Sequence, residues 1–197
     1  MFQHFVGPSI VPRVGRVMKN RQALAEHFAA CGLMVGAEIG VGNGAYSQQL
    51  CAAGLTVYGV DTWASWRRQS YPVALALLAA EIQAGRFLVM KQSSLDAAAT
   101  FAPGSLDWVF IDADHRYAAV KGDIAAWAPK VRAGGIVAGH DYCRLKRSAQ
   151  DGVIRAVNEA VAERGVTLQV TEWDWTNPSR DSRQPSWWFV VGSQGSA

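Results

Sequence analysis

Carboxylate and imidazole side chains follow two apolar runs of the sequence at matching positions. The run 106–111 is followed by Asp112 and His115, and a second apolar run is followed by His140 and Asp141. Carboxylates with an imidazole can hold a divalent cation such as Mg²⁺, Mn²⁺ or Ca²⁺, and His115 is suited to accept a proton near neutral pH. These residues indicate proton-transfer or metal-assisted chemistry. The alternative is structural, with the two acids capping helices and His140 forming a local hydrogen bond.

The two apolar runs have the pattern of buried parallel strands. Residues 108–111 are continuously apolar instead of alternating, as expected for a strand that helices cover on both faces. Neighbouring parallel strands would bring both polar groups to the carboxyl edge of the sheet, where ligands bind in open α/β folds. The expected strands span residues 35–39, 56–60, 87–90, 106–111, 135–138, 166–170 and 187–191.

Helix-like segments alternate with these strands, over residues 16–31, 46–53, 73–84, 95–100, 118–130 and 152–164. This alternation favours a doubly wound, mostly parallel α/β sheet of seven strands. A polar segment instead of a helix joins the last two strands, which predicts an antiparallel last strand at one sheet edge. We expect one domain overall, with an N-terminal arm and helix over residues 1–32 and the main domain over residues 33–197.

A glycine-rich loop follows the first expected strand and opens a helix. Glycine permits positive φ and close approach of a ligand to the backbone, and the helix directs N–H groups toward the bound group. The spacing differs from the G-x-G-x-x-G of dinucleotide-binding loops, and the acid before it would repel a pyrophosphate but hold an ammonium group. The residues expected to bind a cofactor here are Glu38, Gly40, Gly42, Asn43 and Gly44.

Polar residues also end the second and third expected strands. Asp61 lies 23 residues after Glu38, near the ~20-residue spacing of a carboxylate that accepts ribose hydroxyls. Thr62 follows it directly. The pair Ser93-Ser94 is placed to reach an adenine. Helix capping is the alternative role for Asp61 and for the two serines.

Together these features resemble the class I S-adenosylmethionine-dependent methyltransferases. The first motif of that family reads E/D-x-G-x-G-x-G and matches residues 38–44. The resemblance covers most of the chain and implies a Rossmann-like fold with S-adenosylmethionine as the cofactor. It implies that the loop contacts the methionine part, that Asp61 binds the ribose and that Asp112 borders the cofactor. It also implies that Trp63 flanks the adenine, with core packing as the alternative.

The two polar strand ends are similar to those of small-molecule O-methyltransferases of the catechol and macrocin type. The elements D-A-D-H-x-Y and G-G-x-x-x-G-H-D-Y carry this likeness. It implies His115 as a catalytic base beside Asp112, and Asp112, His140 and Asp141 as metal ligands. The catechol enzymes have Asp-Asn in place of His140-Asp141 and a lysine as base. A reaction without metal therefore stays open.

The composition of the chain indicates which binding partners and which cellular compartment to expect. The chain has 197 residues, a formal net charge of +3 and three cysteines, an odd count that favours a reducing cytoplasm. The charge is too small to indicate nucleic acid by itself. No signal-peptide pattern begins the chain, and no apolar run reaches the ~20 residues of a membrane span.

We therefore expect a cytoplasmic enzyme that methylates a hydroxyl of a small molecule. A homodimer is a candidate assembly, because no long inserted lid is present to cover the pocket. Methylation of RNA or protein is one alternative function. A nicotinamide-dependent oxidoreductase is the other, and the glycine spacing argues against it.

Overall fold

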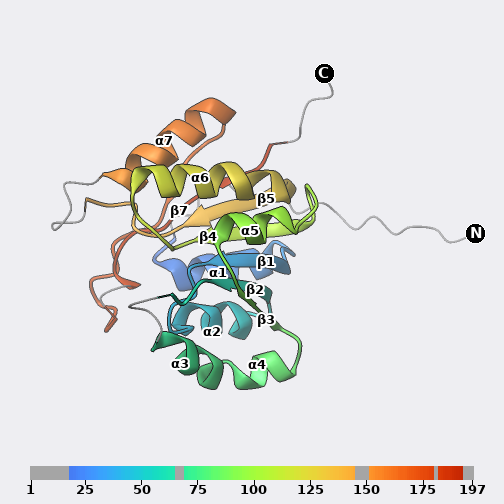
Figure 1. Ribbon diagram of the computed structural model, residues 1–197. Helices are drawn as coiled ribbons and strands as arrows, with labels where there is room; N and C mark the ends of the chain where they lie inside the picture. The colour runs from blue at the N-terminus through green and yellow to red at the C-terminus, as the bar shows by residue number, and fades with distance from the viewer. Residues whose placement is uncertain (1–17, 65–68, 145–150, 180–181, 193–197) are drawn as a thin grey trace, which may run out of the picture.

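The computed structural model describes residues 18–64, 69–144, 151–179 and 182–192. A seven-stranded sheet lies at its centre, with the strand order β3-β2-β1-β4-β5-β7-β6 (Figure 1). Its strands are β1 (Val35–Ile39), β2 (Thr56–Asp61), β3 (Phe87–Lys91), β4 (Leu106–Ile111), β5 (Val131–Gly139), β6 (Gln169–Val170) and β7 (Trp187–Val190).

Strands β1 to β5 pair in parallel, whereas β7 is antiparallel to both β5 and β6. The predicted doubly wound sheet with an antiparallel last strand is confirmed. The chain order reverses between β1 and β4, which pair directly. In open α/β sheets the crevice at such a switch point is where ligands bind.

Helices cover both faces of the sheet (Figure 1). The helices α1, α2 and α3 contribute to one core, and α5, α6 and α7 contribute to the other. Their bounds are α1 (Arg21–Ala30), α2 (Ala45–Ala52), α3 (Ser70–Leu77), α4 (Ala79–Gln83), α5 (Ser94–Ala99), α6 (Tyr117–Trp127) and α7 (Gly152–Arg164), with a short 3₁₀ helix at Ala128–Lys130. No helix in these described ranges is long and apolar enough to span a membrane.

Strand β4 shows why the sequence is continuously apolar here. Trp108 and Phe110 face the first core, while Val109 and Ile111 face the second, and all four are buried. A strand with two buried faces needs apolar residues at every position. The same layering leaves the polar side chains to the two ends of the strand, with Asp107 near its start and Asp112 directly after its last residue.

A few element bounds differ from those expected. The segment 73–84 forms two helices that meet at Leu78, a fully buried residue of the first core. The first helix begins at Arg21; the expected start at residue 16 and the expected N-terminal arm lie outside the described residues. Strand β5 begins earlier, at Val131, and β6 has only two residues.

Candidate active site

The glycine loop joins β1 to α2 and packs tightly against the end of β4. Gly40 has a φ of +96°, and a Cβ built on it would lie 2.2 Å from the carbonyl oxygen of Asp112. Gly44 has a φ of +84° and immediately precedes α2. These positions need glycine for conformation and, at Gly40, also for space. The loop thus holds the ends of β1 and β4 in close contact.

Glu38, which precedes the loop, is a buried acid inside the sheet. Its side chain accepts a short hydrogen bond from the Ser47 hydroxyl on α2. The pKa of Glu38 is raised to about 8, mainly by burial and in part by the nearby Asp112 and Asp61 carboxylates, although the Ser47 hydrogen bond and the Arg21 charge oppose the rise. The side chain is therefore neutral at pH 7 in the absence of a cationic partner.

Asp61 at the end of β2 holds the loop in place. Its carboxylate accepts hydrogen bonds from the backbone N–H of Gly42 at 2.9 Å and of Trp63 at 2.8 Å. The Trp63 indole donates to the Gly42 carbonyl at 2.8 Å and packs against Tyr71. Trp63 is only 2% exposed and has a φ of +43°. Trp63 is therefore packed beneath the loop, and its contact with the adenine stays a prediction.

A cleft of about 950 Å³ runs along the carboxyl ends of β1, β2 and β3 and is bordered by α6. Thr62, Ser93 and Ser94 line it, as does Asp61. Ser93 caps α5 by accepting a hydrogen bond from the Asp96 N–H. Ser93 therefore has the capping role that was the alternative for the two serines. It also borders the cleft.

The floor of this cleft contains an acid that sequence reasoning missed. Asp123 on α6 is 6% exposed and accepts a hydrogen bond from the Ser94 hydroxyl at 2.5 Å. Burial raises the pKa of Asp123 above its ordinary value, although Ser94 opposes the shift. The same hydroxyl accepts a hydrogen bond from the Trp127 indole at 2.9 Å. In the sequence Asp123 is the one acid of a mostly apolar helix, and its spacing does not mark it as a cleft-lining residue.

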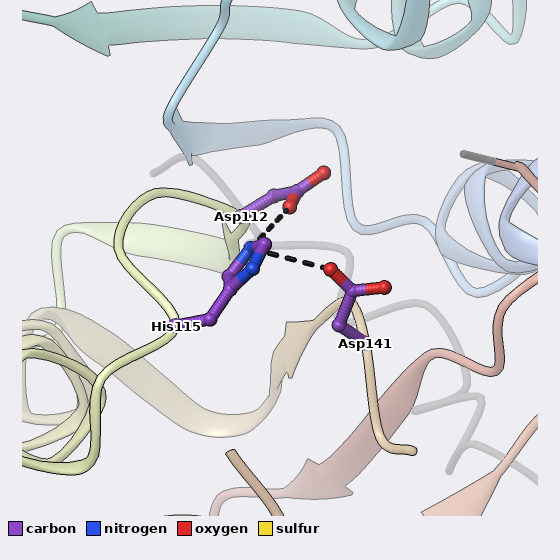
Figure 2. Close-up of side chains that lie close together, drawn as sticks. All are labelled: Asp112, His115 and Asp141. Carbon is purple, nitrogen blue, oxygen red and sulfur yellow. Dashed lines mark hydrogen bonds and ion pairs between the residues drawn. The ribbon is translucent and has the colours of Figure 1, made fainter. Parts of the chain in front are cut away.

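His115 lies between two carboxylates at the ends of β4 and β5 (Figure 2). Its Nε2 atom is 3.4 Å from Asp112 Oδ1 and 3.3 Å from Asp141 Oδ2. Both acids are fixed by the sheet, since the Asp112 N–H donates to the Ile39 carbonyl and the neighbouring His140 N–H donates to the Ile111 carbonyl. The polar residues at the ends of β4 and β5 therefore lie close together, as expected.

The cluster of Asp112, His115 and Asp141 has an unusual backbone conformation and a shifted pKa. Asp141 has a φ of +56°, a strained value for a non-glycine residue that is typical of functional sites. Burial opposes ionisation of Asp112, but the hydrogen bond from His115 and the charges of His140 and Arg21 outweigh it and lower its pKa. Asp112 is therefore an anion at neutral pH.

The expected metal-ligand set differs in one residue from the group that the structure brings together. Asp112, His115 and Asp141 each offer a ligand atom, and these atoms lie within 4.8 Å of one another. His140 is 3% exposed, and its Nδ1 is 3.3 Å from Asp141 Oδ1 and 3.9 Å from Asp112 Oδ2. Asp114 instead binds the exposed Arg116, with Oδ2 2.8 Å from Nε.

A second cleft, of about 390 Å³, adjoins this cluster on the other side of the glycine loop. Its lining includes Glu38, Gly42 and Asn43. It also includes Arg21 from the first turn of α1, which sequence reasoning missed because a lone arginine at a helix start usually faces solvent. Gly40 and His115 line both clefts. The two clefts therefore meet at the candidate base.

A doubly wound sheet, a glycine loop preceded by an acid, and a second-strand acid beside that loop define a class I, Rossmann-like methyltransferase. The chain belongs to a family described as a methyltransferase domain, whose model matches residues 37–142. It is an S-adenosylmethionine-dependent methyltransferase, which removes the oxidoreductase alternative. The matched range runs from β1 to the residue after Asp141 and so contains the carboxyl ends of β1 to β5.

Solved structures share the fold at low sequence identity. The O-methyltransferase from Bacillus cereus in complex with SAH is 17% identical, with a TM-score of 0.65 over 91% of this chain and 84% of that one. The O-methyltransferase TomG from Streptomyces achromogenes, in complex with SAM, is 18% identical, with a TM-score of 0.65 over 88% and 80%. A candidate rRNA methylase from Clostridium thermocellum is 11% identical, with a TM-score of 0.67 over 92% and 100%.

Proposed function

We propose that this enzyme transfers the methyl group of S-adenosylmethionine to a hydroxyl oxygen of a small molecule. The observation that carries the proposal is the position of His115 between the Asp112 and Asp141 carboxylates, at the point where the two clefts meet. A base held there would face both the cofactor and an acceptor. The O-methyltransferases with a similar fold support this reaction type.

The proposed position of the cofactor follows the chemistry of the clefts. The adenosine part occupies the larger cleft, with its ribose beside Asp61 and Thr62 and its adenine toward the Ser93-Ser94 pair. The methionine part enters the smaller cleft, which is lined by Gly40, Gly42, Asn43 and the acid Glu38. Gly44, the last glycine of the loop, stays a predicted contact. The sulfonium then lies near the junction, close to Asp112 and His115.

The reaction needs little beyond alignment and removal of one proton. The acceptor oxygen attacks the methyl carbon, the new C–O bond forms as the C–S bond breaks, and the sulfonium becomes a neutral thioether. His115 takes the proton of the hydroxyl on Nδ1, because its Nε2 donates to the carboxylates of Asp112 and Asp141, and these carboxylates stabilise the resulting imidazolium. Positioning in the clefts supplies the rest of the acceleration.

The same three side chains also fit a divalent cation. Two carboxylates and one imidazole are a suitable donor set for Mg²⁺ or Mn²⁺, and such a cation would lower the pKa of a coordinated hydroxyl. Arg21 Nη1, however, lies 3.4 Å from Asp112 Oδ2, and its positive charge opposes a second cation there. His115 Nε2 cannot ligate a cation while it donates a hydrogen bond to Asp112, so the metal site and the hydrogen-bonded base are alternatives.

Replacement of His115 by glutamine tests the base. We expect kcat to fall by roughly 10²- to 10⁴-fold with phenol or sugar hydroxyl acceptors as probes, while the affinity for SAH measured by calorimetry changes little. His27→Gln is a matched control, because it makes the same change on α1 at a residue that lines neither cleft. Unchanged turnover of His115→Gln would refute the catalytic role.

Chelation tests the metal separately. If the cation is required, EDTA should suppress turnover and Mg²⁺ should restore it. Full turnover in EDTA would remove the metal and leave O-methylation by His115 standing. Cofactor binding itself is tested by SAH calorimetry, where Asp61→Ala and Glu38→Ala should bind much more weakly than the unaltered protein.

Methylation of RNA or protein is the second candidate: the net charge of +3 permits RNA binding without indicating it, and the chain shares its fold with the candidate rRNA methylase. Strongly salt-dependent binding of RNA would support it. We further propose that the enzyme acts in the cytoplasm, where the free thiols of Cys31, Cys51 and Cys143 would stay reduced. Homodimerisation stays a prediction, which light scattering would test.

A further inference from the structure

Arg21 is a buried cation that its neighbours satisfy only in part. Its side chain is 8% exposed and lines the smaller cleft. Nη2 donates to the Ser182 hydroxyl at 2.9 Å, and Nη1 lies 3.4 Å from Asp112 Oδ2, which is long for a charged hydrogen bond. Nε is buried and has no hydrogen-bond partner among the described residues. A buried guanidinium normally requires closer pairing than this.

The charges around the smaller cleft are complementary to a zwitterion. Glu38 and Arg21 both line it, together with the backbone of Gly40 and Gly42. Their side chains interact electrostatically, since Arg21 opposes the rise in the pKa of Glu38. An α-amino acid group carries an ammonium and a carboxylate on the same carbon. A cleft with one acid and one base can neutralise both.

Contacts with Tyr46 and the cap of α1 hold Arg21 in this position. Its guanidinium lies over the Tyr46 ring, 5.0 Å from the ring centroid, and the Tyr46 hydroxyl donates to the Arg21 backbone carbonyl at 3.0 Å. Asn20 caps the helix that carries Arg21 by accepting from the Ala23 N–H. The side chain is therefore preorganised, and ordering it would cost little when an anion binds.

We propose that Arg21 binds the α-carboxylate of the methionine part of S-adenosylmethionine. The inference rests on the proposed placement of the cofactor, with its ammonium group toward Glu38. In this arrangement the planar guanidinium faces a planar carboxylate, the pairing to which arginine is best suited. Arg21 would thus distinguish the intact cofactor from analogues that lack the carboxylate.

Calorimetry with two ligands and four proteins tests this assignment. The ligands are SAH and its decarboxylated analogue, which keeps the amine and the adenosine. The proteins are the unaltered chain, Arg21→Met, Arg21→Lys and Ser182→Ala. Ser182→Ala is the matched control, because it removes a neighbour of Arg21 and leaves the guanidinium in place. Thermal unfolding of each variant reports whether the fold is retained.

Arg21→Met should weaken SAH binding by roughly 10- to 100-fold, the loss of one charge-assisted hydrogen bond. It should change binding of the decarboxylated analogue by less than about threefold, because the lost interaction is specific to the carboxylate. Arg21→Lys should lie between, since lysine keeps the charge without the planar fork. Ser182→Ala should bind SAH nearly as the unaltered protein does.

Two outcomes would overturn the assignment while leaving the proposed function intact. Equal weakening of both ligands by Arg21→Met would show that Arg21 only shapes the site. Unchanged SAH affinity in Arg21→Met would show that the guanidinium serves Asp112 or an acidic acceptor instead. Failure of the unaltered protein to bind SAH would refute the proposed cofactor site as a whole, and so is distinct from both.

Discussion

Glu38 is buried among other acids, which favours its neutral form, although binding of a cofactor ammonium group requires its ionised form. It is 2% exposed and close to the acids Asp61 and Asp112, so its carboxyl group stays neutral, with a pKa of about 8. A cofactor ammonium group would favour the ionised form. We therefore infer that cofactor binding releases a proton from Glu38 at neutral pH, and that the stability of the protein without cofactor reflects the cost of this acid.

Replacing Glu38 with glutamine tests that cost through the pH dependence of stability. In the unfolded chain the acid loses its proton near pH 4.5, but in the folded protein it does so only near pH 8. Between these values the folded state binds more protons, so the free energy of unfolding should fall as pH rises, by up to about 1.4 kcal/mol per pH unit. Above pH 8 this contribution should level off.

Glu38→Gln lacks this titration and still accepts the hydrogen bond from Ser47. Urea unfolding across this pH range should therefore show the variant gaining stability relative to the unaltered protein, with most of the difference reached by pH 8. Glu26→Gln, at an exposed position of α1, should show no such divergence. Parallel curves for Glu38→Gln and the unaltered protein would mean that Glu38 is ionised in the folded state.

Single residues were predictable where spacing along one loop or strand end determines their place. Asp112 and Asp141 follow directly from the ends of two neighbouring parallel strands, as does the acid before the glycine loop. Arg21 and Asp123 were not predictable, because their burial depends on which surface their helices meet in the folded chain. The prediction of His140 as a metal ligand also depended on the fold. Sequence adjacency places it beside Asp141, but only the fold brings His115 between the two acids.

At the scale of elements, most strands and helices have bounds within a residue of those expected, and α7 matches its expected bounds in full. Strands buried on both faces are mostly apolar, so β1 and β4, each with a single acid, have the expected bounds. The break between α3 and α4 at Leu78 has no glycine or proline to signal it. The short strand β6 is likewise determined by its pairing with β7, since the expected run 166–170 contains more apolar residues than the strand uses.

The contact between the glycine loop and β4 can be tested at Gly40. Gly40→Ala should destabilise the protein by more than the ~1–2 kcal/mol expected for an L-residue at positive φ alone, because its Cβ would lie 2.2 Å from the Asp112 carbonyl oxygen. The displaced strand end should also weaken SAH binding, measured by calorimetry alongside urea unfolding.

Gly32 provides the matched control for this substitution. It has a φ of +70°, and a Cβ built there meets nothing within 4 Å. Gly32→Ala should therefore show the conformational cost alone and leave SAH affinity unchanged. Equal losses of stability at the two positions would contradict the packing constraint at Gly40.

At the scale of the whole molecule, one sheet connects two cores. Trp108 and Trp188 belong to the core beneath α1 to α3, while Trp187 and Phe189 belong to the core beneath α5 to α7. Adjacent residues of the same strand thus contribute to opposite cores. Loss of packing on one face should disturb strand pairing and, through it, the other face, so we expect the molecule to unfold as one unit.

Paired substitutions in the two cores test this coupling and the place of the N-terminal helix. Phe28 on α1 is fully buried and stacks on Trp108 with ring centroids 5.2 Å apart, and Ile124 on α6 is buried in the opposite core. Phe28→Ala should cost roughly 3–5 kcal/mol and Ile124→Ala roughly 2–5 kcal/mol. Both should lower the midpoint of one common urea transition, seen alike by far-ultraviolet circular dichroism and tryptophan fluorescence. If residues up to 32 instead formed a separately folding unit, Phe28→Ala would produce an additional early transition and leave the midpoint of the main transition unchanged. Only Ile124→Ala would then lower the midpoint of the main transition.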